Sequence, residues 1–380
     1  MPSSNIPFAV HRADLTALAA EDRRRALTPR TGIDFASNDY LGLAGSAALR
    51  DALADGIARG LPAGSGGSRL LRGNHEEHEA LEAHAARHYG SEAALFFATG
   101  FAANAALFAT LPQRGDLIVH DELIHASAHD GMKLGRAEHA AAAHNDAQAF
   151  DDAIAAWRKA GGTGTPWIAV ESLYSMDGDT APLADLAAVV DRHDGVLVVD
   201  EAHATGAFGP AGAGLAHDLA GRSNLITLHT CGKALGCEGA LLCAPRIVTD
   251  FLVNRGRPFI FSTAPSPLIA WLVRQALEIV ATEPERQAAL HARIRHAEAR
   301  LAALGLPASG SQILPVAIGD NARTMRIAAA LQAGGFDIRG IRPPTVPQGT
   351  ARLRIAITLH VDNDNIDAMT EALAAAMAAA

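Results

Sequence analysis

The sequence is poor in cysteine and in lysine, and it contains no long uninterrupted apolar run. Its three cysteines, Cys231, Cys237 and Cys243, fall close together. An odd number of cysteines without a disulfide framework is typical of a reducing compartment, so we expect a cytoplasmic protein. Their spacing and their apolar neighbours favour small core residues over ligands, and we therefore predict no metal site.

Signals for export or membrane insertion are also missing. No stretch approaches 18 uninterrupted apolar residues, so we expect no membrane-spanning helix. The N-terminus lacks the charged region and apolar region of a signal peptide. A formal net charge of −9 argues against a general nucleic-acid-binding surface. The composition, with 49% hydrophobic and 19% charged residues over 380 positions, is that of a globular protein with a sizeable core.

Strand-like and helix-like segments alternate from about residue 90 to 245. Apolar strands are expected at 93–98, 117–119, 167–171, 195–200 and 225–228, with helices between them. This βαβα rhythm predicts an α/β fold whose mostly parallel sheet is covered by helices on both faces. Ligands bind outside the carboxyl ends of the strands in such folds, and the polar loops of this sequence lie there.

The flanking segments suggest the domain limits. Helices are expected over 10–30 and 44–60 and, as one passage, over about 266–305. Strands at 313–318, 336–340 and 351–358, with intervening helices, predict a smaller α/β unit. We expect an N-terminal segment over 1–43, a large domain over 44–280 and a small C-terminal domain over 281–380.

The expected helix over 75–90 is rich in histidine. Its histidines at 75, 78, 84 and 88 are spaced for one side of the helix. Because no carboxylate or cysteine pair converges with them, we interpret this side as a solvated face.

A basic run, Arg23 to Arg25, ends the first helix. These positive charges either stabilise the C-terminal end of the helix or pair with a carboxylate or phosphate of the substrate.

Lys233 is unusual because it is flanked by glycine in an apolar stretch, 226–245. Burial lowers the pKa of a lysine and leaves a nucleophilic amine, which suits imine chemistry. The plain alternative is a lysine that extends from a strand end toward solvent. A second stretch favours the chemical interpretation, because an apolar strand ends in Asp200 and His203 follows it. Taken alone, Asp200 would be interpreted as a helix cap.

The residues at the strand ends can supply the four groups that one type of cofactor requires. An aldehyde cofactor with a pyridine ring needs an imine-forming lysine, a carboxylate for the ring nitrogen, a phosphate cradle and a flat group against the ring. Lys233 and Asp200 can supply the first two. The helix start at Gly100, with Thr230, can supply the cradle, and His125 can supply the flat group. The combination predicts pyridoxal phosphate.

Six motifs place the chain in a family. The sequence resembles the α-oxoamine synthases, pyridoxal-phosphate enzymes of fold type I, the aspartate-aminotransferase fold, over nearly its whole length. The resemblance rests on the motifs FASNDYLGL, GSGGS, TGFAAN, ESLYSMDGD, DEAHATGAFG and IRPPTVPQGTARLR. It implies a homodimeric acyltransferase with the site at the subunit interface. Within the family, the chain most resembles the enzymes of biotin biosynthesis that condense L-alanine with a pimeloyl thioester and release carbon dioxide.

The resemblance also implies the cofactor contacts. Lys233 would form the internal aldimine and move the substrate's Cα proton, and Asp200 would pair with the pyridine nitrogen. His203 would bond the phenolic oxygen, and His125 would stack on the ring. The remaining implied contacts are with the phosphate (Gly100, Phe101 and Thr230) and near the ring oxygen (Ser175).

The implied substrate contacts lie partly in the last third of the chain. Arg342 and Thr345 would meet the amino-acid carboxylate region, and Arg23 would meet the distal carboxylate of the pimeloyl chain. Asn38 and Glu171 would complete the site. The acyl donor would be pimeloyl-CoA or a pimeloyl-acyl carrier protein.

Two alternatives remain open. A sister synthase that uses glycine or serine with another acyl-CoA would share every cofactor residue. A non-catalytic partner subunit would have lost the lysine or the aspartate, and this sequence has both. The lysine loop also departs from the family pattern at Cys237 and Glu238, where small residues are commoner, and this leaves the fit of the acyl group open.

Overall fold

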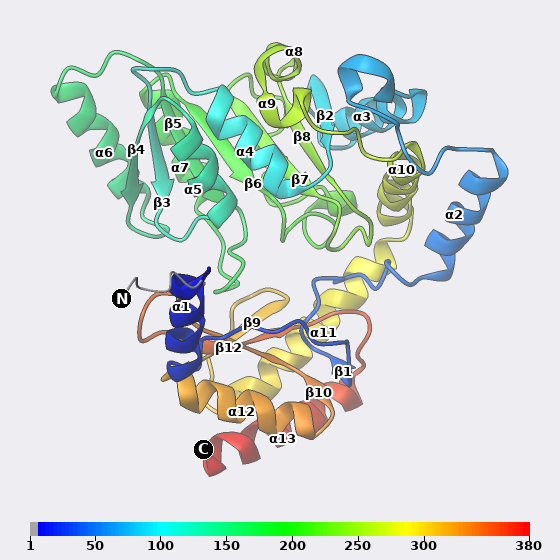
Figure 1. The fold of residues 1–380 in the computed structure, drawn as a ribbon, viewed down its shortest axis with the longest axis vertical. Helices are drawn as coiled ribbons and strands as arrows, with labels where there is room; N and C mark the ends of the chain where they lie inside the picture. The colour runs from blue at the N-terminus through cyan, green and yellow to red at the C-terminus, as the bar shows by residue number, and fades with distance from the viewer. Residues whose placement is uncertain (1–6) are drawn as a thin grey trace, which may run out of the picture. The chain divides into compact units, whose positions relative to one another are not determined.

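The computed structural model describes residues 7–380 and divides them into two compact units. The large unit comprises residues 38–175 and 179–290. The small unit comprises the residues up to 37, residues 176–178 and residues 291–380. The division falls inside helix α11 (Pro284–Ala302). Figure 1 labels the elements.

The large unit is built on a seven-stranded sheet with the strand order β2-β8-β7-β6-β5-β3-β4. Neighbouring strands are parallel except at β8, which is antiparallel to both β2 and β7. The strands are β2 (Ala93–Phe97), β3 (Leu117–Asp121), β4 (Glu138–Ala142), β5 (Pro166–Glu171), β6 (Val196–Asp200), β7 (Leu225–Thr230) and β8 (Ala240–Ala244). The predicted mostly parallel α/β sheet is confirmed.

Helices complete the large unit and leave a hydrophobic core on each face of its sheet. Successive side chains of a strand point to opposite faces, so Val198 belongs to one core and Val199 to the other. The helices are α2 (Ala47–Ala58), α3 (Glu76–His88), α4 (Gly100–Thr110), α5 (Ala126–Leu134), α6 (Ala147–Lys159), α7 (Leu183–Arg192), α8 (Arg246–Arg255), α9 (Arg257–Ile260) and α10 (Pro267–Thr282). A π-helical turn, η1 (Arg69–Gly73), precedes α3.

The small unit has a three-stranded antiparallel sheet and a short parallel pair. The sheet order is β11-β12-β9, and β1 pairs with β10. Its strands are β1 (Ile33–Asp34), β9 (Ile313–Gly319), β10 (Phe336–Asp337), β11 (Arg339–Ile341) and β12 (Ala351–Ala356), and its helices are α1 (Ala9–Ala20), α12 (Asn321–Ala333) and α13 (Asn363–Ala379).

Several local predictions differ from the structure. No α-helix joins β6 to β7. Two short 3-10 turns, η2 (Pro210–Gly212) and η3 (His217–Leu219), lie in that connection, where several glycines have positive φ. The first helix ends at Ala20 rather than near 30, and the passage over 266–305 is two helices, α10 and α11.

The histidine side of α3 is not simply a solvated face. His78 is fully buried. Its Nε2 lies 2.8 Å from the Pro265 carbonyl oxygen, and its Nδ1 accepts the His75 N–H at 3.1 Å. The solvated-face interpretation is wrong for His78, because the segment that precedes α10 covers this part of α3.

Within residues 7–380, no helix combines the length and the apolar character that crossing a membrane requires. The same part of the chain contains no group of three or more His, Cys, Asp or Glu side chains arranged to hold a metal ion.

Candidate active site

A cavity of about 490 Å³ opens at the carboxyl ends of the parallel strands of the large unit. It is in the size range of small-molecule and cofactor sites. The predicted site residues that line it come from six separate segments: Asn38, Gly100, Phe101, His125, Glu171, Asp200, His203, Thr230 and Lys233. Ser175 is the one predicted cofactor residue that does not line the cavity.

Strand register places the two acids of the cavity side by side. Glu171 ends β5 and Asp200 ends β6, and the two residues are partners in the parallel pairing. Asp200 is buried, and its carboxylate accepts the Ala202 N–H at 3.0 Å. Asp200 therefore has a defined orientation at the floor of the site.

A hydrogen-bonded chain joins Asp200 to His125. The Asn104 amide of α4 donates to Asp200 Oδ2 at 2.9 Å and to the Ser127 hydroxyl at 2.9 Å. The Ser127 hydroxyl in turn lies 2.8 Å from Nδ1 of His125. Burial lowers the pKa of His125, although the Asp200 carboxylate acts in the opposite direction. The imidazole is therefore neutral at pH 7.

Lys233 is held in a compact loop that follows β7. The Gly236 N–H donates to the Lys233 carbonyl at 2.9 Å, and the Cys237 N–H donates to the Cys231 carbonyl at 2.8 Å. Gly236 has a φ of +64°, and a Cβ there would lie 2.4 Å from the Ala44 nitrogen, so only glycine fits. The Lys233 ammonium donates to Thr230 Oγ1 at 3.4 Å. The loop thus aims the amine into the cavity instead of letting it extend to solvent.

The N-terminus of α4 forms an anion cradle beside Lys233. Thr99 caps the helix by accepting the Ala102 N–H at 3.0 Å. The N–H groups of Gly100 and Phe101 have no intrahelical partner, as is usual in the first turn. A Cβ on Gly100 would lie 2.7 Å from Thr230 Cγ2, so glycine lets Thr230 approach the helix end. Backbone N–H groups of this kind bind phosphate.

His203 is held from the opposite side of the cavity by Tyr40. The tyrosine hydroxyl lies 2.6 Å from His203 Nδ1 and donates to Asn38 Oδ1 at 3.0 Å. Because the hydroxyl has one hydrogen, donation to Asn38 leaves its lone pairs for an Nδ1–H of His203.

The comparisons with known proteins cover nearly the whole chain. Residues 30–373 match the model of the family "Aminotransferase class I and II". The 8-amino-7-oxononanoate synthase of Anaeromyxobacter dehalogenans is 43% identical over 96% of this chain and 94% of its own. The chain belongs to the class I and II aminotransferase family. The family resemblance predicted from the motifs is thereby confirmed.

Two solved structures give the same result for the fold of this aminotransferase-family chain. A structure of SPT with pyridoxal phosphate as an internal aldimine has a TM-score of 0.89 and 25% identity, and the match covers 98% of each chain. The 8-amino-7-oxononanoate synthase of Francisella tularensis has a TM-score of 0.75 and 26% identity, with 90% of this chain and 97% of that chain covered. The predicted fold type I and the predicted cofactor, pyridoxal phosphate, are confirmed.

The residues of the cavity fit pyridoxal phosphate. The cradle at Gly100 suits its phosphate, Lys233 suits its aldehyde, and Asp200 suits a protonated ring nitrogen. Glu171 supplies a further observation, because its Oε1 is buried without a hydrogen-bond partner in the described part of the chain. Burial and the neighbouring Asp200 raise the pKa of Glu171 well above its usual range. A buried polar atom that faces a cavity indicates that a ligand completes its bonding.

The predicted substrate residues Arg23, Arg342 and Thr345 come together in the small unit. Arg23 Nε donates to the Pro343 carbonyl at 3.1 Å, and Arg342 donates to the Asp22 carbonyl. Arg25 Nη2, rather than Arg23, donates to the Thr345 hydroxyl at 2.9 Å. The basic N-terminal segment and the IRPPTVP block are therefore neighbours, although they are more than 300 positions apart.

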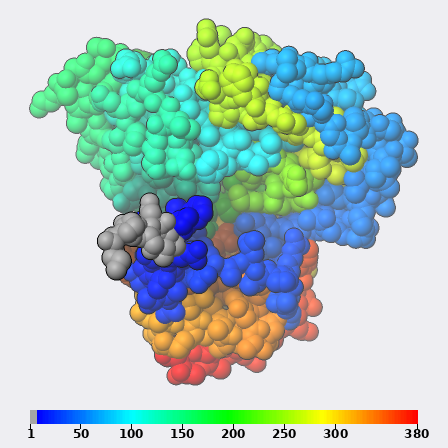
Figure 2. Space-filling view, viewed as in Figure 1, coloured from blue at the N-terminus to red at the C-terminus, as the bar shows by residue number. Residues whose placement is uncertain are grey.

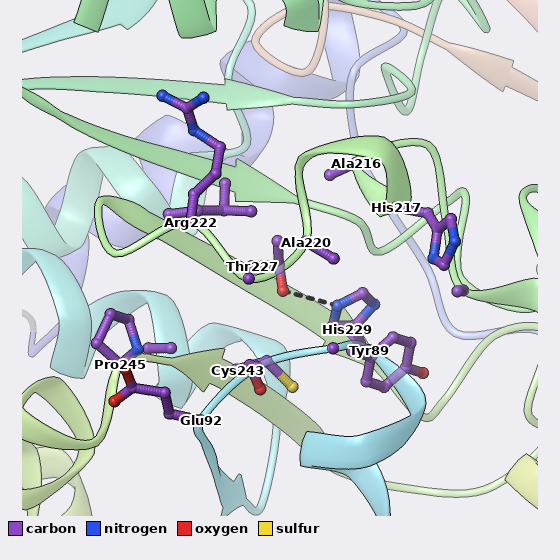
Figure 3. Close-up of a pocket in the computed structure, with 16 residues that line it drawn as sticks. Tyr89, Glu92, Ala216, His217, Ala220, Arg222, Thr227, His229, Cys243 and Pro245 are labelled. Carbon is purple, nitrogen blue, oxygen red and sulfur yellow. Dashed lines mark hydrogen bonds between the residues drawn. The ribbon is translucent and has the colours of Figure 1, made fainter. Parts of the chain in front are cut away.

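A second, smaller cavity of about 30 Å³ lies on the other side of β7. Figure 3 shows the Tyr89 and His229 rings together at its edge. Their centroids are 3.5 Å apart with an interplanar angle of 14°, and His229 Nε2 lies 2.8 Å from Thr227 Oγ1. Burial lowers the pKa of His229 well below its usual range. This neutral histidine anchors the strand end from which Thr230 and Lys233 enter the active site.

Sequence reasoning missed Asn104, Ser127 and Tyr40. Asn104 could have been found from the sequence, because a side-chain amide in the middle of an apolar helix indicates a buried hydrogen-bond partner. Ser127 and Tyr40 carried none, since their partners are distant in sequence and meet them only in the folded chain.

Proposed function

We propose that this chain is an 8-amino-7-oxononanoate synthase, which condenses L-alanine with a pimeloyl thioester and releases carbon dioxide and the free thiol. The observation that carries the proposal is the cavity in which Lys233, Asp200, His203 and the α4 cradle meet. The full-length similarity to synthases of that name supports the choice of substrates.

Each residue has a task in the proposed reaction. Pyridoxal phosphate would supply an electron sink for the pair that develops at the α carbon of alanine. Lys233 would hold the cofactor through its aldehyde and would then take the Cα proton. The Asp200 carboxylate would hold the protonated ring nitrogen, and Asn104 keeps that carboxylate in place. Such preorganised charge acts on the transition state more than on the ground state.

The bond changes balance without an external oxidant or reductant. The Cα electron pair attacks the thioester carbonyl, the C–S bond breaks, and the thiolate leaves and takes up a proton. The C–C bond to the original alanine carboxylate then breaks and releases carbon dioxide. Lys233 returns a proton to Cα. Neutral His125 is the proposed hydrogen-bond partner of the thioester carbonyl oxygen.

Serine is the second candidate amino acid. SPT has the higher of the two TM-scores, 0.89 against 0.75. Its name, serine palmitoyltransferase, indicates a condensation of serine with a long acyl group. The cofactor residues do not distinguish the two reactions, because both use the same chemistry at Cα.

Further proposals follow from the same assignment. Ser175 is proposed to act near the cofactor ring oxygen, and Asn38, Arg342 and Thr345 near the amino-acid carboxylate. The proposed assembly is a homodimer, and the proposed location is the cytoplasm.

The deciding experiment has a covalent readout and a kinetic one. Protein loaded with pyridoxal phosphate is reduced with borohydride, and the modified peptide is identified by mass spectrometry. We expect modification at Lys233, none in Lys233→Ala, and full modification in the matched control Lys159→Ala. Thiol and carbon dioxide release are then measured with pimeloyl-CoA and either alanine, glycine or serine. Release with serine and not with alanine would move the chain to the second candidate. Normal turnover by Lys233→Ala would refute the mechanism.

A further inference from the structure

His144, which does not line the active-site cavity, has a carboxylate on each of its ring nitrogens. Nδ1 lies 2.9 Å and 3.0 Å from the two oxygens of Asp121, and Nε2 lies 2.7 Å from Asp179 Oδ2. A carboxylate only accepts hydrogen bonds, so the ring binds both acids when each nitrogen carries a hydrogen. His144 is then a cation between two anions. We call these three side chains the His144 bridge.

The surroundings of the ring favour this protonated form. Burial opposes the charge, but the hydrogen bonds and charges of Asp121 and Asp179 outweigh it and raise the pKa of His144 above 6.5. Glu122, which accepts the His144 backbone N–H at 3.1 Å, also faces this residue. So does Tyr174, whose ring meets the imidazole edge-on at a centroid distance of 4.4 Å. Neither group adds a positive charge that would oppose protonation.

Asp121 fixes one end of the His144 bridge to the sheet. It ends β3 and is fully buried, and its carboxylate also accepts the Leu123 N–H at 2.8 Å and the Asn145 N–H at 2.9 Å. Asn145 has a φ of +55°, a left-handed conformation in which asparagine is enriched. The next residue, Asp146, is the N-cap of α6, whose green surface is at the upper left of Figure 2.

Asp179 joins the other end of the bridge to the loop between β5 and α7. Its carbonyl oxygen accepts the Tyr174 N–H at 2.9 Å, which closes the loop. Its Oδ2 accepts from His144 and, at 2.7 Å, from the Asn145 amide. Its Oδ1 has no hydrogen-bond partner in the described part of the chain. Among the described residues, His144 therefore supplies the positive charge for this carboxylate.

The loop contacts the active site through Ser175. The Ser175 N–H donates to Glu171 Oε2 at 3.1 Å, and Glu171 lines the active-site cavity. This bond orients the carboxyl group whose other oxygen is buried without a partner among residues 7–380. β3 and β5 are neighbours in the sheet, so the bridge holds the loop at the strand ends where Glu171 lies.

We propose that His144 is a positioning residue: the His144 bridge holds the loop of Ser175 against β3 and so fixes the Glu171 carboxyl at the wall of the active site. The inference rests on the proposed function, because Glu171 is assigned to the site that binds the cofactor. The bridge itself consists of the chain's own residues and needs no ligand. The effect of His144 on the reaction is transmitted through Asp179 and Ser175.

Hydrogen exchange of the apoenzyme, measured by mass spectrometry, tests the bridge without the cofactor. At about pH 6 the Tyr174 and Ser175 N–H groups should exchange roughly tenfold faster in His144→Gln than in the wild type. The reason is that a neutral amide cannot replace a cation between two acids. The ratio should fall as the pH rises through the raised pKa of His144, because the wild type then loses the same charge.

Two further variants keep this measurement interpretable. His193→Gln is the matched control, because it removes another partly buried histidine, whose Nε2 lies 2.6 Å from an Asp151 oxygen at the far end of α7. It should leave the exchange of the loop unchanged. Asp179→Asn keeps an acceptor for His144 and removes one negative charge, so the pH at which the loop loses protection should move to a lower value.

The kinetics of the enzyme loaded with pyridoxal phosphate test the consequence for the site. We expect His144→Gln to lower kcat about tenfold near neutral pH with little change in KM, and still to be modified at Lys233 by borohydride. The wild-type kcat should fall on the alkaline side, through the pKa of His144, and this fall should be absent from the variant. A purely structural role would not remove a step from the pH profile.

The outcomes separate this inference from the proposed function. Unchanged loop exchange in both His144→Gln and Asp179→Asn would overturn the positioning role. Faster exchange together with the wild-type kcat and pH profile would overturn it as well, because the loop would then not position the site. A wild type whose exchange follows this pH dependence, but which condenses none of the amino acids, would refute the proposed function and leave the His144 bridge intact.

Discussion

Asn104 and Asp200 are joined by a hydrogen bond of 2.9 Å, from the asparagine amide nitrogen Nδ2 to the carboxylate oxygen Oδ2. Both side chains are buried, and they are 96 positions apart in the sequence. The bond connects the helix that carries the phosphate cradle to the strand that carries the acid for the pyridine ring. It makes the cradle and the acid parts of one rigid site.

Replacing Asn104 by alanine should lower turnover because it leaves the Asp200 carboxylate short of a donor. A hydrogen bond to a charged group contributes about 1.5–3 kcal/mol, which corresponds to a loss of about 10–100-fold in kcat. Asn254→Ala is the matched control, because it removes an exposed asparagine of α8 that does not line the cavity. Steady-state kinetics of both variants, with thermal unfolding to confirm folding, checks this. Equal losses in the two variants would contradict the role given to Asn104.

Replacing Gly100 by alanine should weaken cofactor binding. The new Cβ would lie 2.7 Å from Thr230 Cγ2 and would push the cradle away from the strand that carries Thr230. Overpacking of this kind costs about 1–3 kcal/mol, so we expect the dissociation constant of pyridoxal phosphate to rise at least about fivefold. Gly64→Ala is the matched control, since nothing lies within 4 Å of a Cβ there. Fluorescence titration of the apoenzyme measures both, and an unchanged dissociation constant in Gly100→Ala would refute the cradle.

Acid should destabilise the protein through His78. Burial lowers the pKa of His78 from 6.5 to about 4. Its Nδ1 must accept the His75 N–H while Nε2 donates to Pro265, and a protonated ring has no acceptor. As the pH falls, His78 therefore takes up a proton in the unfolded chain at a higher pH than in the folded chain. The contribution of His78 to the free energy of unfolding is complete above pH 6.5 and is lost as the pH falls toward 4. It amounts to about 3 kcal/mol at most.

Urea unfolding of the wild type and of His78→Gln between pH 4 and pH 7.5 measures this contribution. The free energy of unfolding of the wild type should fall more steeply below pH 6.5 than that of the variant. Parallel curves would show that His78 is not the responsible group. His88, whose pKa burial lowers to about 4, remains in both proteins and cancels in the comparison.

Replacing Arg23 by alanine should reduce the preference for an acyl chain that ends in a carboxylate. If Arg23 pairs with the distal carboxylate of the pimeloyl group, the variant should raise KM for pimeloyl-CoA about tenfold and leave KM for heptanoyl-CoA unchanged. Arg24→Ala is the matched control, because it removes a neighbouring charge of the same run. Arg25 already donates to Thr345. A larger effect in Arg25→Ala than in Arg23→Ala would shift the assignment by two positions.

The hydrophobic pattern of the sequence was enough to predict the parallel strands and the functional residues that follow them. The apolar runs of β3, β5, β6 and β7 indicated a parallel sheet, and Asp200 and Lys233 were located because each follows such a run. The antiparallel strand β8 was not predicted. Its five-residue apolar run follows a glycine-rich loop, and a short apolar run carries no information on its direction or its partner. The connection from β6 to β7 was expected to be helical, but several glycines with positive φ support tight turns there.

The chemistry of the candidate site was determined by the sequence itself, because a lysine, an aspartate and a glycine-led helix at strand ends have few other uses in combination. Its rigidity was decided only by the tertiary structure. Asn104 meets Asp200, Tyr40 meets His203, and Arg25 meets Thr345 across 96, 163 and 320 positions. Contacts at such separations depend on how the elements pack, and no local pattern of residues encodes that packing.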